Sequence, residues 1–168
     1  YFNPVGAHPS VIIGELQDKP ENLVPVITQT AIGKRNEMQV FGTDYPTRDG
    51  SCVRDYIHVM DIANAHTKAL QYTLDEHNST NCDVFNLGSG NGVTVLELIN
   101  AFEKVSGEKL NYKLGPRRPG DVVEVFANNA KARALLDWDI KYSLDDMMDT
   151  AWRWEVAMKK EAAKISMN

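Results

Sequence analysis

The sequence of 168 residues predicts an α/β fold, because short strand-like segments alternate along it with amphipathic helical segments. The chain is as long as one ordinary domain, which is enough to bury a single hydrophobic core. The segments between the predicted elements are rich in Gly, Pro, Asn and Asp, and no internal repeat is evident. We therefore expect one α/β unit without a repeat architecture.

Helices are predicted where apolar residues recur every three to four positions. The first begins at Asn22, and Pro25 is compatible with it because first-turn amides have no intrahelical partner. The second takes Asp61 as its N-cap and continues to Thr73. A shorter helical turn is expected at residues 128–136.

Two further helices carry clear start signals. Thr94 and Glu97 have the spacing of a capping box, and Gly107 follows the apolar stripe as a stop signal. Ser143 and Asp146 are predicted to cap the last helix. Both helices are thus expected to begin where side chains can bond the free amides of a first turn.

Strands are predicted for short runs bounded by turn residues. These runs are Met38–Phe41, Val53–Ile57, Asp83–Leu87, Leu110–Lys113 and Val122–Phe126. The long segment from Pro4 to Glu21 shows little periodicity, and loops of that length in compact domains are often functional.

Composition excludes some classes of partner. The chain has 18 basic and 23 acidic residues, and no basic run offsets this balance, so a nucleic-acid partner is not expected. No apolar stretch reaches the length that spans a bilayer, so no membrane partner is expected either. Cys52 and Cys82 form no CxxC pair, which favours free thiols in a reducing cytoplasm. The start at Tyr1 without a methionine suggests a chain cut from something longer.

The segment Asp83–Gly92 places a strand, a glycine-rich turn and a capped helix in succession. Its glycines follow G-x-G-x-G rather than the G-x-G-x-x-G of dinucleotide-binding turns. The simpler interpretation is a tight strand-to-helix turn that needs glycine, and a phosphate cradle is the alternative.

Two adjacent arginines, Arg117 and Arg118, precede a Pro-Gly turn and Asp121. A guanidinium group suits bidentate binding of phosphate oxygens, and Asp121 could orient one of the two. The alternative is a solvated ion pair on a surface loop.

The run Val53–Val59 combines a strand pattern with charge. Alternation places Arg54, Tyr56 and His58 on one face, which suggests a polar wall for a ligand. For His58 a structural role near a helix start is favoured, because no metal-ligand or nucleophile spacing accompanies it. The residues therefore predict no metal site.

Two asparagines occupy positions that suit ligand binding. Asn22 could cap its helix, face an anion at the positive end of the helix dipole, or do both. Asn3 leaves a strand at the carboxyl edge of the sheet, where α/β proteins usually bind ligands. From the residues alone, we expect a phosphate site but cannot assign a reaction.

Several segments, taken in order, are specific to one enzyme family. They are Tyr1–Ala7, Asn22–Pro25, Val40–Gly50, Val53–Asp61, Asn86–Gly88 and Arg117–Asp121. The series resembles the second half of the UDP-glucose (UDP-galactose) 4-epimerases, which belong to the extended short-chain dehydrogenases/reductases. The resemblance covers nearly the whole chain. It implies a C-terminal, substrate-binding part (residues 1–168) that lacks most of the Rossmann domain, with residues 1–5 and about 83–92 at the edge of the cofactor domain.

In that family a tightly held NAD takes hydride from C4 of the hexose, and a tyrosine base removes the 4-hydroxyl proton. The resemblance implies NAD as cofactor, a UDP-sugar as substrate and a homodimeric parent enzyme. The glycine-rich cofactor motif, the catalytic Ser and the Tyr-x-x-x-Lys pair are expected upstream of Tyr1. No catalytic residue is therefore predicted in the chain, which should not epimerise alone.

The resemblance also implies binding roles for individual residues. Asn3, Asn22 and Leu23 would contact the diphosphate, Gln39, Val40 and Phe41 the uracil, Arg54 and Arg118 the phosphates, Asp121 the ribose and Phe2 the nicotinamide. Glu21 stands where the family has an asparagine, which is a departure beside the diphosphate contact.

Val125 occupies the position that lines the pocket at C2 of the sugar in that family, where a tyrosine restricts the enzyme to plain hexoses. A valine leaves more room, which predicts that the parent also accepts UDP-GlcNAc and UDP-GalNAc. Two other functions stay open, namely a nucleotide-sugar dehydratase or decarboxylase of the same fold and a non-catalytic nucleotide-sugar-binding module.

Overall fold

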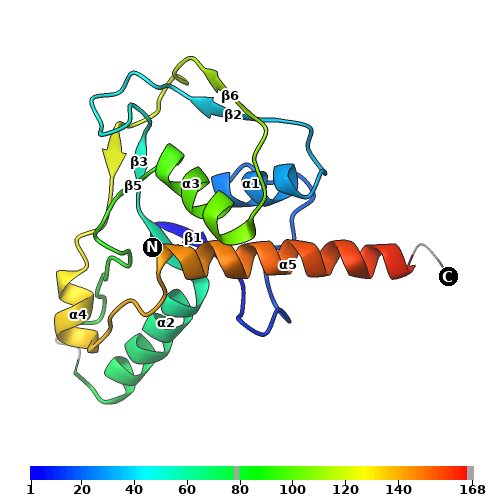
Figure 1. Cartoon of the computed structure of the whole chain (residues 1–168). Helices are drawn as coiled ribbons and strands as arrows, with labels where there is room; N and C mark the ends of the chain where they lie inside the picture. Colours follow the sequence, from blue (N-terminus) through cyan, green and yellow to red (C-terminus); the bar gives the residue numbers. More distant parts are fainter. Residues whose placement is uncertain (78–79, 166–168) are drawn as a thin grey trace.

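The computed structural model describes residues 1–77 and 80–165, and it has the predicted α/β architecture. Its elements are β1 (Asn3–Val5), α1 (Leu23–Ala31), β2 (Met38–Phe41), β3 (Val53–Arg54), β4 (Tyr56–His58), α2 (Val59–Leu74), β5 (Val93–Thr94), α3 (Val95–Ser106), β6 (Tyr112–Gly115), β7 (Glu124–Val125), α4 (Ala130–Leu136) and α5 (Leu144–Ile165). In Figure 1 the long helix α5 crosses the molecule, with α1, α3 and the β2–β6 pair on one side and α2 and α4 on the other.

The strands are short and form three small sheets within the described ranges. β1 pairs in parallel with β4, and β2 pairs in parallel with β6. β3 lies between β5, which is antiparallel to it, and β7, which is parallel. Because β3 and β4 are consecutive, the chain passes directly from the sheet with β7 to the sheet with β1.

Two hydrophobic clusters hold these elements together. The larger lies between α1, α3, α5 and the inner faces of β2 and β4, and it includes Ile27, Val40, Leu98, Phe102 and Met148. The smaller joins Ile57 to α2 and α4 around Trp138, whose indole N–H donates to the Asp61 carbonyl at 2.9 Å. The amphipathic stripes seen in the sequence thus face one another across α5 and between α2 and α4.

Most predicted helix starts are confirmed. The capping box of Thr94 and Glu97 is formed, and Gly107 ends α3 with φ 75°. The Ser143 hydroxyl accepts from the Asp146 N–H at 3.2 Å, while the Asp146 carboxylate accepts from the Ser143 N–H at 2.8 Å.

The predicted N-cap of α2 is wrong. The helix begins at Val59, and the cap is His58, whose Nδ1 accepts from the Met60 N–H at 3.1 Å. Asp61 lies in the first turn and accepts instead from the backbone N–H groups of Lys141 and Tyr142 at 3.0 and 3.2 Å. The Asp61 carboxylate, which the sequence suggests as a local cap, therefore bonds backbone amides that are distant in the sequence.

Some strand predictions also need correction. Residues 83–87 form no strand, and the one backbone bond described for this segment outside regular elements runs from Phe2 N–H to Leu87 C=O. The predicted strand over 53–57 is divided at Asp55, and the strand predicted at 110–113 runs instead over Tyr112–Gly115. Apolar alternation locates such strands but does not show where a neighbouring strand is available to pair with them.

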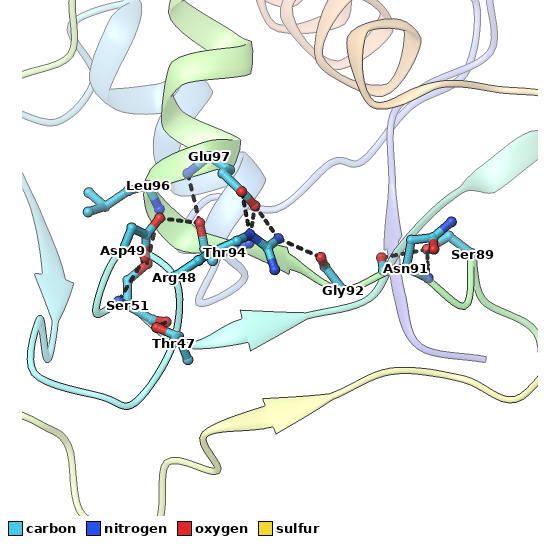
Figure 2. A network of polar contacts seen from close by, with 10 residues as sticks. All are labelled: Thr47, Arg48, Asp49, Ser51, Ser89, Asn91, Gly92, Thr94, Leu96 and Glu97. Carbon is cyan, nitrogen blue, oxygen red and sulfur yellow. Dashed lines mark hydrogen bonds and ion pairs between the residues drawn. The ribbon is translucent and has the colours of Figure 1, made fainter.

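The loop that joins β2 to β3 is fastened to the start of α3 (Figure 2). Arg48 forms a two-point ion pair with Glu97 and also donates to the Gly92 carbonyl at 2.7 Å. Asp49 accepts from the hydroxyl groups of Ser51 and Thr94. The Arg48 guanidinium lowers the pKa of Glu97 to about 2, so this attachment persists at mildly acidic pH.

No helix in residues 1–77 or 80–165 combines the length and apolar character needed to cross a bilayer. Cys52 is buried and Cys82 is exposed, and both are free thiols as predicted.

Candidate functional site

A cavity of about 680 Å³ opens between the start of α1, strand β2 and the end of β3. Nearly all of the residues predicted to bind substrate line it. They are Asn3, Asn22, Leu23, Gln39, Val40, Phe41, Arg54, Arg118 and Asp121. Segments that are far apart in the sequence thus meet around one space whose size suits a nucleotide-sized ligand.

One wall of the cavity carries a charge cluster on an aromatic ring. Arg118 donates through Nε and Nη2 to the two carboxylate oxygens of Asp121, at 3.1 and 3.0 Å, and its guanidinium lies 4.7 Å from the centre of the Phe41 ring. Arg54 approaches the same carboxylate at 3.8 Å. Two cations therefore share one anion in this cluster, while over the whole lining Arg35, Arg54 and Arg118 are matched by Glu21, Glu37 and Asp121.

Each of these arginines is held in place by the backbone or by a ring. Arg54 Nη1 donates to the carbonyl groups of Val53 and Val122, at 2.8 and 2.7 Å. The Asp121 carboxylate raises the pKa of Arg118, so this guanidinium stays charged. Because their geometry is set before a ligand arrives, little side-chain entropy is lost on binding a phosphate.

The two adjacent arginines have separate roles. Arg117 points away from the cavity, lies 4.2 Å from the centre of the Tyr45 ring and donates to Asp44 at 2.8 Å. The solvated surface pair that the sequence left open as an alternative therefore describes Arg117, whereas Arg118 belongs to the cavity.

The start of α1 faces the cavity with free donors. Asn22 is the N-cap residue, yet its side chain makes no capping hydrogen bond and is exposed. The first turn of α1 contains no acidic side chain, and its leading amides have no partner within the helix. Asn22 and Leu23 thus present the positive end of a helix to an anion.

Asn3 has a structural contact as well as a place in the cavity wall. Its side-chain Nδ2 donates to the Asp55 carbonyl at 2.8 Å, and its backbone N–H donates to the same oxygen at 3.1 Å. Asn3 is the first residue of β1 and pairs with Tyr56, the first residue of the parallel strand β4, so it lies at the amino end of this short sheet, and the predicted place at a carboxyl edge is wrong.

Two predicted site residues do not line this cavity. Phe2 lies outside it, and its backbone N–H bonds to Leu87. Val125 lies on β7 opposite Arg54, with 37% of its surface exposed, and is not among the residues that line this cavity. The roles proposed for them at the nicotinamide and at the sugar therefore stay predictions.

His58 is not part of a ligand wall. It is fully buried, its Nε2 lies 3.0 Å from the Thr150 hydroxyl, and its ring stacks on Tyr142 with centroids 4.0 Å apart. Burial lowers its pKa to about 4. Of the polar face predicted from alternation, Arg54 and Tyr56 line the cavity and His58 has the structural role that the sequence favoured.

The glycine-rich turn binds an internal carboxylate instead of a phosphate. Asp55 is fully buried, and its two oxygens accept from the N–H groups of Ser89, Gly90 and Ala127 at 2.8, 3.0 and 2.9 Å. A Cβ added at Gly88 would lie 2.5 Å from the Asp55 carboxylate. The Ser89 and Gly90 amides are therefore occupied, and the phosphate-cradle alternative is wrong. The turn is tight as expected, but no strand precedes it, because residues 83–87 form none.

Sequence reasoning missed two charged residues of the cavity, Arg35 and Glu37. Arg35 comes from the turn between α1 and β2 and lines the same space. In the sequence it follows Gly33 and Lys34, a pattern typical of a solvated helix end, and no local signal distinguishes it. The Arg35 side chain runs back along α1, and only this tertiary arrangement brings it to the cavity.

Comparison with known proteins places this site in a family. Residues 5–151 match the family described as GDP-mannose 4,6 dehydratase. The chain is 52% identical to the UDP-glucose 4-epimerase of Bacillus subtilis over 92% of its length, but over only 45% of the relative's. It is also 52% identical to a bifunctional UDP-glucose and UDP-xylose 4-epimerase of Pisum sativum, of which it covers 44%.

Solved structures agree with these relatives. The UDP-glucose 4-epimerase of Stenotrophomonas maltophila, with bound NAD and formylated UDP-arabinopyranose, superposes with a TM-score of 0.91 at 49% identity. The match covers 96% of this chain and 47% of that one. The enzyme of Bifidobacterium longum, in complex with NAD+ and UDP, gives a TM-score of 0.84 at 41% identity.

The chain thus spans less than half the length of the curated relatives it matches. Within that span its α/β fold agrees with the solved epimerase structure over 96% of the chain, and the family match runs from the last residue of β1 to the first turns of α5. The chain therefore belongs to the GDP-mannose 4,6-dehydratase family, and the relatives it resembles there are UDP-glucose 4-epimerases.

Proposed function

We propose that the whole protein is a UDP-hexose 4-epimerase that interconverts UDP-glucose and UDP-galactose, and that this chain supplies its UDP-sugar site. The observation that carries the proposal is the cavity in which the Arg118–Asp121 pair, the Phe41 ring and the start of α1 meet. These groups match the parts of a UDP-sugar: an aromatic surface for the base, a carboxylate for the ribose, and cations and helix amides for the diphosphate.

The charge cluster suggests how the nucleotide would be oriented. Asp121 accepts two bonds from Arg118, and its remaining lone pairs can accept from ribose hydroxyl groups. The N–H groups of Arg118 and Arg54 that are not bonded to protein can donate to phosphate oxygens. Opposite them, the amides that open α1 supply neutral donors with a favourable dipole.

We propose NAD as the hydride carrier of the whole protein, beside Phe2. The described residues do not by themselves fit a dinucleotide, because the amides of the glycine-rich turn are bonded to Asp55. Since the chain spans less than half of its relatives' length, we propose no catalytic residue within it. Its residues bind and orient the substrate.

A dehydratase is the second candidate, because the matching family is described by a GDP-mannose 4,6-dehydratase activity. Product analysis of the whole protein separates the two reactions. An epimerase converts UDP-glucose to UDP-galactose of equal mass, whereas a dehydratase releases water and leaves a keto sugar. Competition by UDP but not by GDP is expected, and a protein inhibited only by GDP would contradict the proposal.

Arg118→Ala is expected to weaken UDP binding by the whole protein about 10- to 100-fold, because it removes charge-assisted bonds to the phosphates and leaves Asp121 with only Arg54, 3.8 Å away, as a partner. Arg117→Ala is the matched control, since this neighbour pairs with Asp44 outside the cavity. Isothermal titration calorimetry with UDP measures both. Equal losses for the two variants would argue against a site centred on Arg118.

The sugar specificity of the whole protein is proposed to be broad. Val125 is small for a pocket wall, so we expect turnover of UDP-GlcNAc as well as UDP-glucose. Val125→Tyr is expected to lower kcat/KM for UDP-GlcNAc about 100-fold or more through a steric clash while leaving UDP-glucose turnover within a few-fold. Wild-type enzyme that converts UDP-glucose but not UDP-GlcNAc would refute this prediction.

The whole protein is further proposed to be a homodimer, as the epimerase resemblance implies. A cytoplasmic location is also proposed, because the two free thiols favour a reducing compartment. Residues 1–5 and 83–92 are proposed to border a cofactor domain. Two observations support this, namely the bond between Phe2 and Leu87 and the exposure of Tyr1 and Val84, each at 70%. Sedimentation analysis tests the oligomeric state.

A further inference from the structure

Arg35 reaches back along α1 to the loop that precedes the helix. Its Nε donates to the side-chain oxygen of Gln29 at 2.9 Å, and its Nη2 donates to the carbonyl of Pro20 at 3.0 Å. Gln29 is only 6% exposed, and its own Nε2 donates to the carbonyl of Gln17 at 3.3 Å. The two side chains thus bond both ends of the segment 17–20.

The same glutamine also fixes the turn that carries Arg35. The backbone N–H groups of Lys34 and Arg35 both donate to the Gln29 carbonyl, at 2.9 and 3.1 Å. Gln29 therefore joins the turn after α1, through its main chain, to the loop before α1, through its side chain. We call Gln29 and Arg35 together the loop clamp.

The loop clamp acts next to the site. Pro20 is buried and lines the cavity, and only Glu21 separates it from Asn22, the N-cap of α1. Asn22 has no capping bond of its own to hold it, so the chain on either side determines its place. The bonded carbonyl groups of Gln17 and Pro20 provide that restraint on the loop side.

We propose that Arg35 is a positioning residue for the nucleotide site, which acts through Gln29 and Pro20 to preorganise Asn22 and the first amides of α1 for the diphosphate. This inference rests on the proposed function. An unrestrained loop would lose conformational freedom when ligand binds, and restraining it beforehand removes that cost from the affinity.

Arginine suits this role better than lysine. Its planar guanidinium presents Nε and Nη2 to two acceptors on different segments, whereas a lysine ammonium has no fixed fork. Arg35→Lys therefore keeps the positive charge of the cavity but is expected to lose the simultaneous bonds to Gln29 and Pro20. Gln29→Leu removes the clamp from the other side, and Gln29 does not line the cavity.

The test uses the whole protein, UDP as the calorimetric ligand and UDP-glucose as the kinetic substrate. Arg35→Lys and Gln29→Leu are each expected to weaken UDP binding about 5- to 20-fold. The control is Arg133→Ala, which removes an exposed arginine on α4 that pairs with Asp139 and does not line the cavity, and this variant should bind UDP as wild type does.

Kinetics separates positioning from a merely structural role. Since the nucleotide is held equally in the ground and transition states, KM should rise by the same factor while kcat changes less than about twofold. A variant that only misfolds would lose kcat in proportion to its active fraction. Asn22→Ala combined with Arg35→Lys should weaken UDP binding no more than the worse single variant, because both substitutions disturb the same start of α1.

Three results would overturn the inference. The first is wild-type UDP affinity in both clamp variants, and the second is a loss in Arg35→Lys without a loss in Gln29→Leu, which would mean that Arg35 touches the ligand directly. The third is a fully additive loss of UDP affinity when Arg35→Lys is combined with Asn22→Ala, which would mean that Arg35 does not act through the start of α1. Wild-type protein that fails to bind UDP would instead refute the proposed function itself, and this inference with it.

Discussion

Asp55→Asn is expected to lower the free energy of unfolding by about 3–5 kcal/mol, the largest effect we anticipate for a single substitution. The Asp55 carboxylate is fully buried and accepts from the N–H groups of Ser89, Gly90 and Ala127, and also from the Ser89 hydroxyl at 2.6 Å. An asparagine of the same shape must turn one NH2 group toward these donors. At least one buried amide then lacks an acceptor, and the favourable negative charge is lost.

The consequence extends beyond the turn. Asp55 separates β3 from β4, so its bonds tie the glycine-rich turn and the segment after β7 to the strands that carry Arg54 and Tyr56. A loss of that size is a large part of the total stability of a typical domain, about 5–15 kcal/mol, and it should also disturb the cavity wall.

Urea unfolding at neutral pH, followed by circular dichroism, measures the change. Asp75→Asn is the control, because Asp75 is exposed at the end of α2 and its carboxylate accepts a single bond from Gln71 at 2.7 Å. We expect the control to change the stability by less than about 0.5 kcal/mol. Comparable, small losses in the two variants would show that the buried carboxylate contributes little.

The second large effect is a loss of stability as the pH falls from about 6.5 to about 4, because of His58. Its pKa falls from the ordinary 6.5 to about 4 in the folded protein, since burial disfavours the imidazolium, although the charge of Asp146 opposes this in part. Nδ1 accepts from Met60 N–H, so the neutral ring carries its proton on Nε2, facing Thr150. Protonation of Nδ1 would place its N–H group against the Met60 N–H group, and two donors cannot form a hydrogen bond with each other.

The sign follows from proton linkage. Above pH 6.5 both folded and unfolded states hold a neutral His58, and its contribution to stability is fully present. Between pH 6.5 and 4 the unfolded chain binds a proton that the folded chain does not, so the free energy of unfolding falls by about 3 kcal/mol. Glu97, whose pKa is lowered from 4.5 to about 2, loses its contribution at lower pH, progressively as the pH falls from 4.5 to about 2.

Stability curves at several pH values test this. His58→Asn keeps a residue that can cap α2 but cannot titrate, so the variant should be less stable at pH 7.5 and should lack most of the decline between pH 6.5 and 4.5. A wild-type protein whose stability stays level over that interval would contradict the prediction. An identical decline in the variant would assign it to another group.

Other parts of the molecule show why some sequence predictions succeed. The start of α3 is predictable because its capping box needs only Thr94 and Glu97, which lie within one turn. The arginine pair shows the opposite case. Arg117 and Arg118 are chemically identical neighbours, and their different partners, Asp44 and Asp121, depend on how the whole loop packs on Phe41 and Tyr45.

By itself the sequence determined the α/β class, the start of α1 at Asn22, the capping of α3 and, through resemblance, nine of the residues that line the cavity. These features depend on contacts within a turn or on motifs carried by consecutive residues. Only the tertiary structure decided that Asp55 fills the glycine-rich turn, that His58 caps α2, and that Arg35 reaches the site. Each of these depends on which distant donor or acceptor a buried polar group meets, and local pattern does not encode that choice.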